Sequence, residues 1–168
     1  LSVSHSLPVV GGFARATTAS VDLIGSLDLT STDTVLVNGQ AALLDAVNGA
    51  WSLAGVGLFP GINRVTVMAL DAEGEVLDEQ WIEIWYEDGT TSALTGPITA
   101  NTTLAPGDGP YRISGELVIA PGATLTIQAG TSLYFDQGAL ITVNGVLKSQ
   151  GSAYARVYCG PVPNAALV

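Results

Sequence analysis

The sequence predicts an all-β protein, with an antiparallel sandwich followed by a short right-handed parallel β-helix. Short runs rich in valine, isoleucine and threonine recur along the chain, and turn dipeptides such as Asn-Gly and Pro-Gly separate them. The 168 residues include 20 glycines, and the apolar runs are too short for helices. Between residues 115 and 151 the runs shrink to three to five residues at even spacing, as in a stacked coil.

The first 88 residues follow a pattern of strands and turns. Residues 1–18 are weakly patterned and are predicted to form an N-terminal arm or first strand, which Gly11-Gly12 would let pair with another chain. Residues 20–24 form the first regular strand. Asn38-Gly39 between residues 34–37 and 40–44 predicts a hairpin with a type I′ turn. Residues 50–53, 62–70 and 75–86 complete six or seven strands, as expected for a sandwich over residues 19–88.

This part resembles a known family in several short motifs: Val37-Asn38-Gly39, Trp51, Pro60-Gly61-Ile62-Asn63, Ala69, Asp71 and Gly74. They resemble the bacterial immunoglobulin-like modules of large secreted and surface proteins. The resemblance covers residues 19–88. It implies an immunoglobulin-like sandwich that acts as a spacer, an adhesive unit or an accessory domain.

The last hairpin of the sandwich has two different faces. Side chains alternate along a strand, so the regular apolar set is predicted to face the core: Val65, Val67, Ala69, Ile82 and Ile84. With Glu73-Gly74 at the turn, the strand register places Arg64 opposite Glu83 and Thr66 opposite Trp81. The other face is too apolar for solvent and is predicted to be an interface with the β-helix or with another chain. Its residues are Ile62, Arg64, Met68, Leu70, Leu77, Trp81, Glu83 and Trp85. The alternative is a sugar-stacking platform made by the two tryptophans.

Residues 89–168 are predicted to contain the cap and first coils of the β-helix. Residues 87–96 are the expected junction, and residues 97–111 are the lead-in. The predicted coil strands are residues 117–119, 125–127, 133–135, 141–143, 146–147 and 155–158. Residues 122–151 resemble the start of bacterial pectate-lyase-like β-helices. That resemblance implies catalytic residues on middle coils beyond this chain, which would make it the accessory and cap region of a polysaccharide lyase or hydrolase.

The charge and composition of the chain exclude some classes of binding partner. The chain carries 15 acidic and 5 basic side chains, for a net charge of −10. Nucleic acid is therefore not expected to bind, because that binding depends on Lys and Arg. The longest apolar stretch, residues 41–62, is broken by polar residues, so no membrane insertion is expected. Cys159 is the single cysteine, so no disulfide can form within the chain. It is predicted to be a small buried residue, with an intermolecular bridge or a reactive thiol as alternatives.

Few residues offer catalytic or metal chemistry. His5 is the single histidine, so no Ser–His–acid set and no zinc site is expected within the chain. One acidic turn is a calcium candidate, although its spacing does not match the EF-hand; a solvated turn is the alternative. Its residues are Asp71, Glu73, Glu75 and Asp78.

Taken together, the expected function is that of a non-catalytic structural or adhesive module of a bacterial extracellular or cell-surface protein. Its expected partners are other protein chains or its own copies, joined by strand pairing into fibres. Polysaccharide binding is the alternative.

Overall fold

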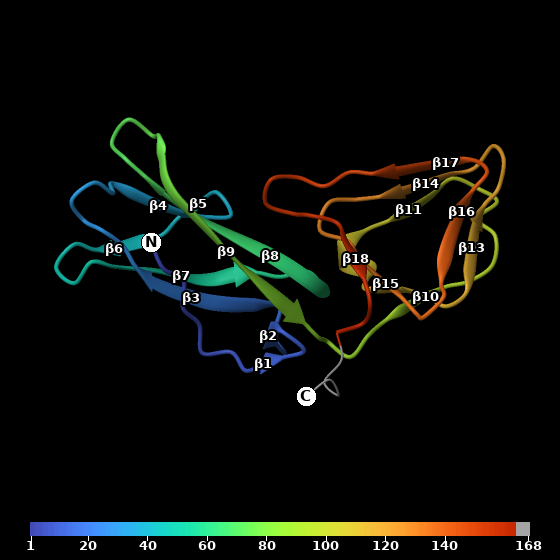
Figure 1. The fold of residues 1–168 in the computed structure, drawn as a ribbon, viewed down its shortest axis with the longest axis horizontal. Helices are drawn as coiled ribbons and strands as arrows, with labels where there is room; N and C mark the ends of the chain where they lie inside the picture. The colour runs from blue at the N-terminus through green and yellow to red at the C-terminus, as the bar shows by residue number, and fades with distance from the viewer. Residues whose placement is uncertain (164–168) are drawn as a thin grey trace.

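The computed structural model describes residues 1–163, and the chain is all-β in two parts that lie side by side (Figure 1). Residues 1–86 form the first part, and residues 92–160 form about three turns of a β-solenoid. The helical content of the described residues is one 3₁₀ turn, η1 (Pro106–Asp108). No helix in this range is long and apolar enough to cross a membrane. The predicted all-β class is confirmed.

The first part contains two sheets with a common core. The larger sheet has the strand order β1-β2-β9-β8-β4-β5, and the smaller has the order β3-β7-β6. Buried residues from both sheets form one hydrophobic cluster, so the sheets pack as a sandwich. The strands are β1 (Val9–Val10), β2 (Phe13–Ala16), β3 (Ser20–Ser26), β4 (Thr34–Val37), β5 (Gln40–Ala41), β6 (Leu43–Asp45), β7 (Ala50–Gly57), β8 (Gly61–Leu70) and β9 (Val76–Tyr86).

The larger sheet is mixed, which corrects the expectation of a wholly antiparallel sandwich. β2 pairs parallel with β9, with Ala14 opposite Ile84, whereas the other strand pairs of the two sheets are antiparallel. The cause is the turn at Gly11-Gly12, where φ values of 58° and 86° accompany the chain reversal between β1 and β2. After this reversal β2 runs in the same direction as β9.

The N-terminal arm belongs to both sheets. Its first residues run beside β3, where Ser2 N donates to Ser26 O at 2.8 Å and Ser4 N donates to Ile24 O at 2.7 Å. The arm then crosses to the larger sheet and continues as β1 and β2. In this chain the arm therefore extends its own sheets.

The Asn38-Gly39 hairpin forms as predicted. Both residues have positive φ values, 47° and 79°, which is the requirement of a type I′ turn. The strand predicted over residues 40–44, however, is divided. β5 pairs with β4 in the larger sheet, whereas β6 pairs with β7 in the smaller one. The chain must cross between the sheets at Ala42, so one continuous strand is impossible there.

The second part is a parallel β-solenoid. Three sheets have the strand orders β10-β12-β15-β18, β11-β14-β17 and β13-β16, and every pairing in them is parallel. Tyr111 lies opposite Leu133 and Leu125 opposite Leu147, so one coil takes 22 residues at these positions. The strands are β10 (Ser92–Leu94), β11 (Thr102–Leu104), β12 (Tyr111–Ile113), β13 (Glu116–Ile119), β14 (Thr124–Ile127), β15 (Ser132–Phe135), β16 (Leu140–Val143), β17 (Val146–Ser149) and β18 (Tyr158–Gly160).

Most of the predicted coil strands are confirmed, with two corrections. The solenoid begins at β10, inside the expected junction of residues 87–96, because residues 92–94 gain a parallel partner in β12. The last strand is residues 158–160 instead of 155–158. Ser152 and Ala155 close a turn by mutual backbone hydrogen bonds, so the extended segment starts only after that turn.

The solenoid core consists of inward-facing leucines and isoleucines stacked from coil to coil. Leu117, Leu125 and Leu133 are each 0% exposed. The third coil is less covered, because β16 and β17 each have one neighbouring strand among the described residues. Val143 and Leu147 are consequently 46% and 38% exposed.

Candidate functional site at the junction of the two parts

The hairpin of β8 and β9 has the register that the sequence predicted. Arg64 lies opposite Glu83 and Thr66 opposite Trp81. Arg64 Nη2 donates to Glu83 Oε1 at 2.9 Å, and the guanidinium carbon lies 5.1 Å from the centre of the Trp81 ring. The ion pair and the cation–π contact therefore fix Arg64 on the outer face of the hairpin.

This outer face is divided into a buried and an exposed half. Ile62 and Trp85 are 4% and 7% exposed, whereas Leu77 and Trp81 are 45% and 56% exposed. Met68 and Leu70 are half-buried, as are Arg64 and Glu83. Because the ring of Trp85 is buried, it cannot form the sugar-stacking platform with Trp81 that was the alternative prediction.

The β-solenoid covers the buried half. Ile62 and Trp85 form a cluster with Tyr134, and Tyr158, Val10 and Phe13 pack against it. The ring of Tyr158 lies edge-on to Tyr134 and Phe13, at centroid distances of 6.1 and 6.3 Å. The junction thus contains an aromatic cluster whose rings come from four strands, β2, β9, β15 and β18.

Sequence reasoning missed Tyr134 and Tyr158, although one signal was present. Leu133 points into the solenoid, so the alternation of β15 places Ser132 and Tyr134 on its outside. Both are nevertheless buried, at 1% and 3% exposure. A large aromatic residue on the outside of a coil indicates that something covers it.

Close backbone contacts fix the junction further. Ile62 N donates to Ser132 Oγ at 2.9 Å, and this hydroxyl in turn donates to Ile62 O at 3.4 Å. Gly61 has a φ of 109°, and a Cβ added there would overlap the side chain of Ser132. Likewise, a Cβ on Gly130 would lie 2.8 Å from Phe59 Cδ2. The two parts meet where glycine hydrogens leave just enough space.

The loop between β17 and β18 makes a third contact. It reaches from the solenoid toward the turn between β4 and β5 (Figure 1). A Cβ on Gly39 of that turn would lie 3.0 Å from Tyr154 Cε2, so the tyrosine ring packs directly over the glycine. The solenoid therefore contacts the sandwich at β2, β8 and β9, at Phe59 and at the turn between β4 and β5.

Burial at the junction shifts several pKa values. Desolvation raises the pKa of Tyr134 far above its ordinary value of 10.0, and the neighbouring Tyr158 adds to the effect. Burial also raises the pKa of Tyr158. Cys159 was predicted to be buried, but it is an exposed residue, on the last strand that its sheet has within residues 1–163. Desolvation of its thiol raises the thiol pKa, which disfavours the reactive thiolate.

A groove follows the junction on one side. A cavity of about 220 Å³ lies between the outer face of β8 and β9 and the start of β18; Arg64, Glu83, Arg156 and Cys159 are among its lining residues. A second cavity of about 90 Å³ continues beside it, and its lining includes Phe59 and Tyr154. Ile62, Arg64 and Arg156 line both cavities, which joins them into one groove.

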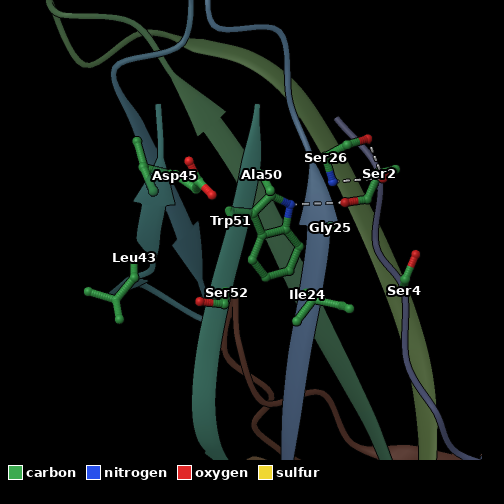
Figure 2. A pocket seen from close by; sticks show the side chains of 11 residues that line it. Ser2, Ser4, Ile24, Gly25, Ser26, Leu43, Asp45, Ala50, Trp51 and Ser52 are labelled. Carbon is green, nitrogen blue, oxygen red and sulfur yellow. Dashed lines mark hydrogen bonds between the residues drawn. The ribbon is translucent and has the colours of Figure 1, made fainter. Parts of the chain in front are cut away.

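Another cavity lies away from the junction, on the smaller sheet of the sandwich (Figure 2). It has a volume of about 510 Å³ and lies between the N-terminal arm and β6. Trp51 is 2% exposed at its floor, where Nε1 donates to Ser2 O at 3.0 Å. Its single charged lining residue, Asp45, accepts hydrogen bonds from the local groups of Val47 and Asn48. The charged group that lines the cavity is therefore already engaged in its own turn.

The acidic turn uses its oxygens locally. Asp71 Oδ1 accepts hydrogen bonds from the backbone N–H of Glu73 at 3.0 Å and of Glu75 at 2.8 Å. Asp78 pairs with the amino group of Leu1 at 3.2 Å. Over residues 1–163, no group of three or more acidic, histidine or cysteine side chains could hold a metal ion. Calcium binding at this turn stays a prediction from the sequence.

Comparisons with protein-family models, with curated proteins and with solved structures find no match. They give no indication of catalysis. A β-solenoid is itself compatible with enzymes and with non-enzymes.

Proposed function

We propose that the chain is a rigid, non-catalytic structural module of a bacterial extracellular or cell-surface protein. The observation that carries this proposal is the junction, where Ile62 and Trp85 are buried under Tyr134 and the backbones touch at Gly61 and Gly130. Interfaces that combine an aromatic core with such close backbone packing resist relative motion of the parts. The module would keep its two parts at a fixed relative orientation.

The strand orders support an immunoglobulin-like sandwich as the first part. In that fold, strands lettered A to G along the chain form the sheets A-B-E-D and G-F-C. If the N-terminal arm is strand A, then β3, β4, β6, β7, β8 and β9 correspond to B, C, D, E, F and G. The sheet orders are then A-B-E-D and G-F-C. For the solenoid we propose a right-handed sense, because parallel crossovers are right-handed in about 98% of cases.

Small-angle X-ray scattering of the whole chain tests rigidity. The profile should fit one rigid shape at every ionic strength. Replacing Tyr134 and Tyr158 together by alanine should loosen the junction and require a mixture of shapes. Trp81→Ala is the matched control, because this exposed residue lies on the same hairpin but outside the junction. A native profile that needs freely moving parts would refute the proposal, as would turnover of a polysaccharide by the purified chain.

Self-assembly by strand pairing is a second candidate, favoured by the third coil of the solenoid. Its outer strands expose four apolar side chains at 38% to 48%, next to backbone edges that no described strand pairs with: Leu140, Val143, Val146 and Leu147. Sedimentation should show association that Val143→Lys with Leu147→Lys abolishes. Val76→Lys, at an exposed position of the sandwich, should leave association unchanged. A strictly monomeric native chain at high concentration would exclude this candidate.

A further inference from the structure

The junction groove is a local concentration of basic groups in an acidic protein. Arg64 and Arg156 both line it, and they are two of the 5 basic residues in a chain of net charge −10. Arg64 is paired with Glu83, whereas Arg156 forms no salt bridge within residues 1–163. The two arginines and one glutamate therefore leave the groove with an excess positive charge.

The groove offers arginine N–H donors, whereas its two asparagine side-chain oxygens are already engaged. Nε of Arg64 is buried and has no hydrogen-bond partner within the described part of the chain. The amide oxygens that line the groove are already used: Asn63 Oδ1 accepts from Phe59 N at 2.8 Å, and Asn38 Oδ1 accepts from Thr66 N at 2.9 Å. A neutral sugar needs both donors and acceptors from its site, whereas a carboxylate accepts only. The groove is thus suited to a carboxylate.

Aromatic rings flank these arginines. Phe59 and Tyr154 are 43% and 39% exposed beside the groove, and each is held against a glycine of the opposite part. Trp81 lies under the Arg64 guanidinium. Arginine with tyrosine and tryptophan is the composition of binding hot spots between proteins. Because the cavities are only about 220 and 90 Å³, they accommodate single side chains.

We propose that the junction groove binds an acidic peptide segment of a partner protein. The carboxylate pairs with Arg156, whose planar guanidinium offers two parallel N–H donors to its two oxygens, and the guanidinium of Arg64 adds positive charge beside it. A neighbouring side chain of the peptide packs against Tyr154 and Phe59. The carboxylate comes from an aspartate or glutamate side chain or from a peptide C-terminus. The site requires both parts of the chain, because Arg64 and Arg156 come from different ones.

Peptide titration of the whole chain tests this proposal. One probe is the peptide SGEYEGS with both ends blocked, and its control is SGQYQGS. The glutamate peptide should bind at least about tenfold more tightly, the usual effect of a charge-assisted hydrogen bond. Arg156→Gln should weaken its binding about tenfold. Lys148→Gln is the matched control, since Lys148 also forms no salt bridge among residues 1–163 but lies outside the groove.

Two further probes identify the source of the carboxylate. The first is SGQYQGS with a free C-terminus. If it binds as tightly as the glutamate peptide, the site binds chain ends; if it binds more weakly, the site binds acidic side chains. Nuclear magnetic resonance should place the shifts at Tyr154 and Arg156. The proposal is overturned if neither carboxylate peptide saturates the chain, if Lys148→Gln weakens binding as much as Arg156→Gln, or if a uronic-acid hexasaccharide binds more tightly than the peptides.

Discussion

Gly61→Ala should destabilise the chain through its contact with the solenoid. The φ of Gly61 is 109°, outside the range that L-residues favour, which costs about 1–2 kcal/mol. The new methyl group would also overlap the Ser132 side chain, and overpacking of this kind costs about 1–3 kcal/mol. The free energy of unfolding should therefore fall by about 2–5 kcal/mol, a large part of the roughly 5–15 kcal/mol typical of domains.

Urea unfolding followed by tryptophan fluorescence measures this loss, because Trp85 lies at the junction. Gly74→Ala is the matched control. Its φ is 85° and no atom lies within 4 Å of the added Cβ, so this variant should lose only the free energy that the unfavourable backbone conformation costs. The difference between the two variants should be about 1–3 kcal/mol, or about 1 M in the urea midpoint.

A second substitution separates the contact from other effects. Combining Gly61→Ala with Ser132→Gly removes the overlapping atoms, so the double variant should lose less stability than the sum of the single variants. Equal losses for Gly61→Ala and Gly74→Ala, or strictly additive losses in the double variant, would refute the close contact between the two parts.

Three further predictions concern single positions and pH. Tyr134→Phe should change the free energy of unfolding by less than about 1 kcal/mol, because the removed hydroxyl is buried and lacks a hydrogen-bond partner among the described residues; calorimetry showing a loss above about 2 kcal/mol would contradict this. Gly25→Ala should detach the N-terminal arm, because its Cβ would overlap Ser2 O and the Trp51 ring; faster hydrogen exchange at Ser2 and Ser4 is the expected readout, and unchanged exchange speaks against it. Stability should be complete below about pH 10 and fall as the pH rises further, because burial raises the pKa of Tyr111, Tyr134 and Tyr158 and the unfolded chain ionises first; an unfolding free energy that stays constant from pH 8 to 11 would exclude this linkage.

Local patterns in the sequence predicted much of the secondary structure. The register of β8 and β9 followed from the alternation around Val65 and Val67 and from the turn at Glu73-Gly74. The coil strands followed from short apolar runs between glycine corners. Both patterns repeat within a few residues and reflect which side chains can face a core. Such short-range periodicity is present in a single sequence.

The candidate site depended on long-range packing. The sequence indicated that Ile62 and Trp85 need a cover, but not that Tyr134 and Tyr158 provide it. It also gave no sign that β2 would join β9 in parallel, or that the strand after Gly39 would be shared between two sheets.

The junction groove depends most strongly on long-range packing. Arg64 and Arg156 are 92 residues apart in the sequence and line the same cavities only because the solenoid packs on the sandwich. Periodicity determines which face of each strand is buried. The contact between two separately folded surfaces depends on their three-dimensional shapes, so the tertiary structure alone brought the two arginines together.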